Sequence, residues 1–345
     1  MDELETYAEL LGRDRPEVQD LLLRARLFPR ERERYLRFLR DLCLREGRDI
    51  LNPPVFRDYD GPWPLPEDFY TTHVLKVATT KAGKSHSTYG EICSLIERGV
   101  RVIIFDPQNE YIDLGLTFAG RVLVAWPDLL RIGLLQPSGD EGPEDVAIRL
   151  SINARESFFF RDMSENLFFQ AVVETLKSKQ DPTVHDLMQS LASKAKNPRE
   201  RNYGAMETIL NRLNRLVTEM PGTFSAPKGL PAEFFLQNSV VFPLKGISSY
   251  LANFLINHII QMVMRHKTFS DSLDILFVLE ECQNYINRQR EARLDLGEVF
   301  IYSAMRMARK LGLGFQLLSQ TLSTFSPAIL ANANTVFVGR LLNGT

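Results

Sequence analysis

The feature that most constrains the fold is a short motif near residue 80, between a predicted strand and a predicted helix. Residues 78–85 read Ala-Thr-Thr-Lys-Ala-Gly-Lys-Ser. The apolar run 73–77 precedes them, and residues 87–98, with apolar side chains at helical spacing, follow them up to Gly99. A strand, a tight loop and a helix in this order are the context of a phosphate-binding loop, whose amides and helix N-terminus point donors at one spot. The sequence therefore predicts a nucleoside triphosphate site.

Each residue of this loop has an expected place at the nucleotide. The predicted nucleotide-binding residues are Ala78, Thr79, Thr80, Lys81, Ala82, Gly83, Lys84, Ser85 and His86. We expect Lys84 to reach the β- and γ-phosphates of ATP and Ser85 to hold Mg²⁺. His86 either contacts the nucleotide or is an ordinary residue at the helix start. The alternative for the whole segment is a loop that only caps a helix.

A second segment with chemical information follows a long apolar run. Residues 272–279 read Ser-Leu-Asp-Ile-Leu-Phe-Val-Leu, which predicts a strand buried on both faces, and Glu280 and Glu281 come directly after it. Ligands of open α/β sheets bind at the carboxyl ends of the strands, so we expect this pair beside the phosphates. We assign Glu280 to the metal and Glu281 to polarising the attacking water. A solvated pair at the start of a loop is the alternative.

The third segment combines basic residues with a polar strand end. A helix is expected to carry Arg306, Arg309 and Lys310. We expect it to end near Gly312 or Gly314, and a strand then finishes at Gln320. Gln320 either senses the γ-phosphate or positions water, or it is an ordinary strand terminus.

Together these segments resemble the HerA/FtsK superfamily of P-loop ATPases, and most closely its HerA-like branch, which is related to the conjugative type IV secretion ATPases. The resemblance covers about residues 71–341. The matching stretches are the phosphate loop at 78–85, the Asp-Pro-x-x-Glu-Tyr turn at 106–111, the acidic-pair motif at 280–284 and the segment from Arg309 to Gln320. The combination of four motifs in the right order makes the resemblance specific.

The resemblance implies an α/β fold, with a RecA-like core on a mostly parallel sheet. It further implies a homo-oligomeric, hexameric ring with ATP and Mg²⁺ at each subunit interface. A neighbouring subunit would donate an arginine, a position that Arg309 matches, with Arg306 as the runner-up. The function implied is an ATP-hydrolysing, helicase-like DNA translocase, with DNA and a nuclease or other effector protein as partners. The alternatives are a secretion or conjugation-apparatus ATPase and a non-hydrolysing nucleotide-dependent scaffold.

The chain departs from the family pattern at four positions. Ala78 replaces the first glycine of the loop, and Lys81 stands where the family usually has glycine. Glu280 replaces the usual aspartate, and Gln283 replaces a common histidine. None of these changes removes a group that the chemistry needs, so we expect an active site.

The order of the segments predicts three parts of the chain. An N-terminal helical segment at 1–50 is followed by a stiff linker at 51–70 that contains five prolines. The RecA-like ATPase domain spans 71–345. Helical patterns within it, at about 143–236, predict a helical insertion between core strands.

Composition limits the class of protein. Of 345 residues, 44% are hydrophobic and 24% charged, as in ordinary globular proteins. The net charge of −2 disfavours a strongly basic nucleic-acid binder but is compatible with a ring whose pore lining alone is positive. The acidic start, 1–5, does not predict a signal peptide, and the apolar stretches, which are short, do not predict a membrane span. We expect a cytoplasmic protein without membrane insertion.

The N-terminal segment leaves its role open. Residues 3–12 and 16–48 are expected to be helical. Between Arg24 and Arg48 there are nine arginines against four acidic residues. This excess of positive charge either contacts a DNA backbone or an acidic partner, or forms a solvated helical face.

Two further features also have more than one interpretation. The cluster Phe158-Phe159-Phe160 is expected in the core, at a subunit contact or on a loop that faces a pore. Asp106 and Glu110, at a predicted strand end, either orient the metal or water or cap a turn.

Overall fold

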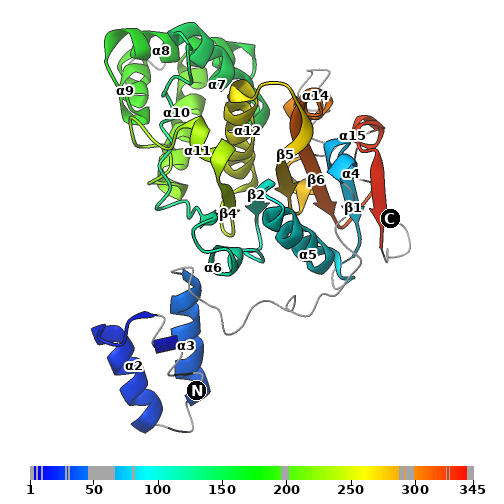
Figure 1. Cartoon of the computed structure of the whole chain (residues 1–345). Coiled ribbons are helices and arrows are strands. Elements are labelled where there is room, and N and C mark those ends of the chain that lie inside the picture. The colour runs from blue at the N-terminus through cyan, green and yellow to red at the C-terminus, as the bar shows by residue number, and fades with distance from the viewer. Residues whose placement is uncertain are drawn as a thin grey trace.

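The structure is a computed structural model. It describes residues 67–79, 82–195, 202–286 and 299–339 except 324 and 326, together with 4, 7, 8, 11–27, 29, 32–45 and 292. Within these ranges the main body is a parallel sheet covered by helices (Figure 1). The predicted linker at 51–70 lies almost entirely outside the described residues.

The sheet has seven strands, and every pairing between neighbouring strands is parallel. The strands are β1 (Val74–Val77), β2 (Arg101–Asp106), β3 (Val122–Val124), β4 (Ser239–Pro243), β5 (Ser270–Leu279), β6 (Leu311–Ser319) and β7 (Thr335–Val338). Their order across the sheet is β3-β4-β2-β5-β6-β1-β7. This confirms the expected α/β fold, and it puts β6 between the strand of the phosphate loop and the strand of the acidic pair.

Of the helices in the described residues, the first two come before the strands in the chain, and the others precede, connect or follow individual strands. The helices are α2 (Pro16–Leu27), α3 (Arg32–Arg45), α4 (Glu67–Thr71), α5 (Lys84–Glu97), α6 (Leu114–Thr117), α7 (Pro143–Phe158), α8 (Asp162–Ser178), α9 (Val184–Lys194), α10 (Tyr203–Glu219), α11 (Ala232–Gln237), α12 (Ser249–His266), the short 3₁₀ helix η2 (Cys282–Asn284), α14 (Phe300–Ala308) and α15 (Pro327–Asn332). No helix among the described residues is long and apolar enough to cross a membrane.

The alternation of side chains along β2 shows how the sheet separates two hydrophobic clusters. Val102 and Ile104 pack into the cluster that contains the apolar face of α5. Ile103 and Phe105 face the opposite way, into the larger cluster that contains α7, α8, α12 and α14. Because all four are buried, the strand is apolar throughout, as expected for a parallel sheet with helices on both faces.

The predicted helical patterns between 143 and 236 form helices α7 to α11. Figure 1 shows α8, α9 and α10 gathered beyond α12, on the side away from the strands. Thr183 caps α9, and its hydroxyl accepts a hydrogen bond from the backbone N–H of Asp186. Phe158 and Phe160 are buried, and half-buried Phe159 packs against the same cluster. The core interpretation of the three phenylalanines is therefore confirmed.

The N-terminal segment differs from the single helix expected over 16–48. The structure has two helices, α2 and α3, which are separated around Pro29. Proline has no backbone N–H and its ring clashes with the preceding turn, so the helix is interrupted there. The two helices share a small apolar cluster that includes Val18, Leu39 and Cys43.

The helix with the basic residues ends earlier than expected. The last residue of α14 is Ala308, Arg309 is its C-cap, and both candidate stop glycines lie in β6. Gly312 has a φ of 65°, and a Cβ on it would lie 2.5 Å from the carbonyl oxygen of Ser272. A glycine here permits close approach of β5 to β6, which is a role that helix periodicity does not reveal.

His73 joins three elements at the end of β1 opposite the phosphate loop. It stands directly before β1 with a φ of 66°. Its Nδ1 accepts a hydrogen bond of 3.2 Å from the backbone N–H of Phe315, and its Nε2 lies 2.7 Å from the carbonyl oxygen of Met305. Burial lowers the pKa of His73 to about 4. The imidazole is therefore neutral, with its proton on Nε2.

This burial predicts a specific loss of stability in acid. In the unfolded state His73 takes up a proton near its ordinary pKa, whereas in the folded state its pKa is about 4. The free energy of unfolding therefore falls as the pH decreases from the first of these pKa values to the second. The loss from this residue should be about 3 kcal/mol. Urea unfolding from neutral to acid pH should show a smaller loss for His73→Asn, which tolerates a positive φ and does not titrate. Equal pH dependence of the two proteins would contradict this assignment.

Candidate functional site

The phosphate loop connects β1 directly to α5. Val77 ends β1, and Gly83 precedes α5 with a left-handed φ of 82°. Lys84 and Ser85 are the first two residues of the helix, so α5 begins three residues before the predicted start at 87. The backbone N–H groups of this first turn have no partners within the helix and point toward the loop, which favours an anion. Thr80 and Lys81 lie outside the described residues.

The alanine that replaces the first loop glycine is accommodated without strain. Ala78 is buried and is not among the residues with a positive φ. A Cβ on Gly339 would lie 2.8 Å from the Cβ of Ala78. The methyl group of Ala78 therefore occupies space that is left open by a glycine after β7.

Lys84 lies between the two carboxylates of the acidic pair. Its Nζ is 3.6 Å from Oε2 of Glu280 and 3.6 Å from Oε1 of Glu281. Both glutamates directly follow β5, whereas Lys84 is on α5, the helix that follows β1. In the sheet, β6 lies between β1 and β5. The structure thus brings the phosphate loop and the acidic pair together at the carboxyl edge of the sheet.

The Lys84 ammonium group fits a site for phosphate. Its side chain is only 7% exposed, and Nζ has no hydrogen-bond partner among the residues that the structure describes. A buried ammonium group without hydrogen bonds is costly, because it has lost water and gained only ion pairs at longer range. Phosphate oxygens at the N-terminus of α5 would supply the missing acceptors.

Glu280 is held by hydroxyl groups on two sides. The hydroxyl of Ser85 donates to its Oε1 at 2.8 Å, and the hydroxyl of Tyr111 donates to the same atom at 3.3 Å. Burial raises the pKa of Glu280, although Lys84 acts in the opposite direction. A hydroxyl and a carboxylate in contact form the oxygen donor set that suits Mg²⁺.

Glu281 is surrounded by side-chain amides. It has a left-handed φ of 49°, which is costly for a residue with a Cβ and is typical of functional sites. Oε1 accepts hydrogen bonds from Nε2 of Gln320 at 2.7 Å and from Nε2 of Gln108 at 3.2 Å. Oε2 accepts one from Nε2 of Gln283. The residue assigned to activating water is therefore held in one orientation.

Asp106 has the capping role that was one of its two interpretations. Its carboxylate accepts the backbone N–H of Gln108 at 3.2 Å and that of Tyr111 at 2.8 Å. It is fully buried, and this burial raises its pKa to about 7. Asp106 thus holds the turn after β2, and that turn carries Gln108 and Tyr111 to the acidic pair.

A buried ion pair lies behind the phosphate loop. Nζ of Lys76, on β1, is 2.5 Å from Oε1 of Glu91, on α5. The other oxygen of Glu91 accepts a hydrogen bond of 2.7 Å from Nε2 of Gln316, on β6. The three side chains are buried and link the helix of the phosphate loop to two strands. This network was not predicted, because its only signal in the sequence is a lysine inside an apolar strand.

The candidate arginines lie far from the phosphate loop of their own chain. Arg309 and Arg306 are exposed at the end of α14, immediately before β6 begins. β6 pairs in parallel with β1, so its first residue is at the edge of the sheet opposite the loop. Its nine residues span roughly 26 Å at about 3.3 Å per residue. Arg309 therefore does not join Lys84, Glu280, Glu281 and Gln320 within one chain.

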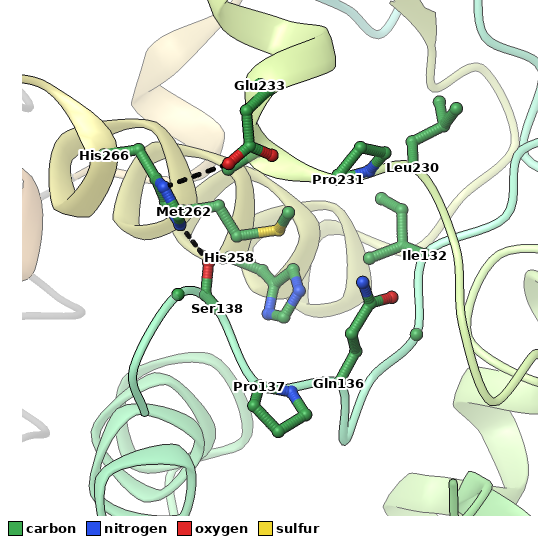
Figure 2. Close-up of a pocket in the computed structure, with 13 residues that line it drawn as sticks. Ile132, Gln136, Pro137, Ser138, Leu230, Pro231, Glu233, His258, Met262 and His266 are labelled. Carbon is green, nitrogen blue, oxygen red and sulfur yellow. Dashed lines mark hydrogen bonds and ion pairs between the residues drawn. The ribbon is translucent and has the colours of Figure 1, made fainter. Parts of the chain in front are cut away.

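A separate cavity of about 140 Å³ lies between the loop at 132–139 and helices α11 and α12 (Figure 2). Oγ of Ser138 is 2.6 Å from Nε2 of His266, and Nδ1 of His266 is 3.5 Å from Oε1 of Glu233. The order of these groups is that of a hydrolytic triad. However, the Glu233 side chain is 58% exposed and does not hydrogen bond to the imidazole. The contacts join the loop to the two helices.

The remaining predicted residues are close to the loop in sequence and structure. Thr79 and Ala82 lie in the loop, and His86 is the third residue of α5. Gln108, Gln283 and Tyr111 were not predicted as site residues. The Asp-Pro-x-x-Glu-Tyr pattern could have indicated the turn that carries Gln108 and Tyr111, but not that their side chains reach the acidic pair.

The chain is similar to known proteins in sequence and in fold. Residues 65–263 match the family described as Helicase HerA, central domain. VirB4 of Thermoanaerobacter pseudethanolicus is 19% identical over 77% of this chain and 76% of that chain, with a TM-score of 0.58. The plasmid coupling protein TrwB in complex with ADP and Mg²⁺ is 13% identical over 86% of this chain and 76% of that chain, with a TM-score of 0.57. No curated protein sequence matches the chain.

At these low identities the two structures establish a shared fold, whereas the family match covers more than half of the 345 residues. The chain therefore belongs to the HerA helicase central-domain family, among the P-loop ATPases of the FtsK/HerA superfamily.

Proposed function

We propose that the chain binds and hydrolyses ATP and uses the energy to move DNA through a hexameric ring of its own copies. The observation that carries the proposal is the position of Lys84. This buried ammonium group, which has no hydrogen-bond acceptor within the described part of the chain, lies 3.6 Å from two carboxylates at the N-terminus of the helix after a phosphate loop. Such an arrangement is complementary to the phosphates of a nucleotide and to the charge that develops during phosphoryl transfer.

ATP and Mg²⁺ are the proposed ligands. Structures of the relative TrwB contain ADP with Mg²⁺ or a non-hydrolysable ATP analogue. Lys84 and the loop amides would hold the β- and γ-phosphates, while the contact between Ser85 and Glu280 would open to hold the metal. Bound Mg²⁺ would neutralise charge on the phosphate oxygens.

Two side chains are proposed to act on the attacking water. Glu281 would accept hydrogen bonds from it, because this carboxylate lies beside Lys84 without the hydroxyl contacts that hold Glu280. Gln320, at the end of β6, would donate to the γ-phosphate or to the water. Its Nε2 donates to Glu281 in this structure, so it is already within reach of the reacting groups.

We propose DNA as the substrate that is translocated because the chain belongs to the HerA helicase family. A nuclease or other effector protein is proposed as a partner for the same reason. A conjugation-apparatus ATPase is the second candidate, because the fold is shared with VirB4 and with a plasmid coupling protein. The two functions use the same nucleotide chemistry and differ in what stimulates hydrolysis.

Steady-state ATP hydrolysis with and without linear double-stranded DNA at low salt distinguishes these functions. We expect hydrolysis that depends on Mg²⁺, and an increase of severalfold on addition of DNA. Glu281→Gln keeps the shape of the side chain but removes the carboxylate, so it should bind ATP and lose at least 100-fold in kcat.

Three other results of these assays would each contradict one part of the proposal. Hydrolysis that does not respond to DNA would favour the conjugation-apparatus ATPase. ATP binding without hydrolysis in the wild type would indicate a nucleotide-dependent scaffold. Normal turnover by Glu281→Gln would show that another group activates the water.

Assembly as a ring is proposed because Arg309 lies at the sheet edge opposite its own phosphate loop. From there its guanidinium could reach only the nucleotide of a neighbouring copy.

Arg309→Ala should therefore abolish hydrolysis while ATP affinity changes by less than about threefold. Mixing Arg309→Ala with Glu281→Gln should restore part of the activity, because some interfaces then combine an intact arginine with an intact glutamate. A mixture as inactive as either variant alone would contradict donation between subunits, and Arg306→Ala serves as the matched comparison.

A further inference from the structure

We propose that Gln108 is a positioning residue that sets the orientation of the Glu281 carboxylate for hydrolysis. The inference rests on the proposed ATPase function and adds a residue to its machinery. Gln108 comes from the turn after β2, which is neither part of the phosphate loop nor of the strand that carries the acidic pair.

The hydrogen bonds of Glu281 come from three separate elements. Gln320 lies at the end of β6, Gln283 is in η2, and Gln108 is in the turn after β2. Each donates an amide N–H, and together they reach both oxygens of the carboxylate. A glutamate has three rotatable side-chain bonds, so contacts from several directions are needed to fix its carboxylate plane.

The three donors are not equivalent. Gln283 is only two residues from Glu281 and contacts Oε2, on the other side of the carboxylate from Lys84. Gln320 contacts Oε1 but is also the residue proposed to interact with phosphate or water. Gln108 is the remaining donor to Oε1, at 3.2 Å, and has no other assigned role at the site. Nζ of Lys84 is 3.6 Å from the same oxygen, so the amide of Gln108 is the shorter of these two contacts to Oε1.

The turn that carries Gln108 is itself held firmly. The buried Asp106 carboxylate accepts the backbone N–H of Gln108 and that of Tyr111. Asn109, between them, adopts a left-handed φ of 62°. The hydroxyl of Tyr111 donates to Glu280 at 3.3 Å. One capped turn therefore supplies a donor to each member of the acidic pair, which is the arrangement expected of a support for reacting groups.

The exposure of Gln108 makes its role testable without damage to the core. Its side chain is exposed, although its amide reaches the carboxylate of the buried Glu281. Substitutions here leave the buried turn residues Asp106 and Tyr111 intact. Gln180, an exposed glutamine at the end of the α8 region, is a matched control.

The test compares kcat for ATP hydrolysis with the affinity for a fluorescent non-hydrolysable ATP analogue in Gln108→Ala, Gln108→Glu and Gln108→His. We expect Gln108→Ala to lower kcat at least tenfold, and Gln108→Glu to lower it further, because a second carboxylate would repel Glu281. Gln108→His should stay within about threefold of the wild type, since an imidazole N–H has a similar reach. Analogue affinity should change by less than about threefold in Gln108→Ala and Gln108→His, and Gln180→Ala should match the wild type.

Several results would overturn the inference. If Gln108→Ala keeps the wild-type kcat, Gln108 does not position Glu281. If it loses analogue affinity in parallel with kcat, its effect is a general disturbance of the site. A Gln108→His variant as slow as Gln108→Ala would show that hydrogen-bond donation to Glu281 does not explain the effect of residue 108 on kcat. Absence of hydrolysis in the wild type would overturn the proposed function together with this inference, whereas an active wild type with unaffected variants would overturn the inference alone.

Discussion

The site depends on the electrostatic interaction of Lys84 with Glu280 and Glu281. Nothing in the local sequence brings these groups together, because the lysine and the glutamates are almost 200 residues apart. Parallel strand order does so: β6 separates β1 from β5, and the ends of all three strands meet at one edge of the sheet. Lys84 can then lie 3.6 Å from each carboxylate. Burial strengthens the attraction between these charges relative to water, but the ammonium group has no hydrogen-bond acceptor among the residues described.

The surrounding structure keeps these charges in place. Behind the loop, the buried pair of Lys76 and Glu91 connects β1 to α5, and Gln316 connects Glu91 to β6. A buried pair of this kind adds little net stability but fixes one arrangement, because each charge needs the other. The helix that presents Lys84 is thus tied to two strands. We infer that this network keeps the N-terminus of α5 directed at the acidic pair.

Local sequence patterns predicted a large part of the fold and of the candidate nucleotide site. The loop at 78–85, the buried strand before Glu280 and the polar end of β6 each had a residue pattern with a physical meaning. The parallel sheet followed from the family resemblance. Pro29 is a signal for a break, but the regular apolar spacing on both sides of it favoured a single helix over 16–48. The close approach of β5 at Gly312 was not visible, because a glycine after a helix normally marks its end.

Long-range side-chain contacts could not be predicted from the sequence. The amide of Gln108 reaches Glu281 across 173 positions of the chain, and no periodicity connects them. Likewise, the methyl group of Ala78 is accommodated by Gly339, which follows a different strand. Such contacts depend on strand order and register, which the sequence pattern constrains only in part. The functional residues that were missed are therefore those that act through another side chain.

A crystal structure with Mg²⁺ and a non-hydrolysable ATP analogue would show whether Lys84 pairs with the acidic residues only until phosphate is present. We expect phosphate oxygens within hydrogen-bond distance of Lys84 Nζ, and a separation between Nζ and the two carboxylates that exceeds 3.6 Å. Nucleotide bound elsewhere, with both ion pairs of Lys84 unchanged, would contradict this expectation.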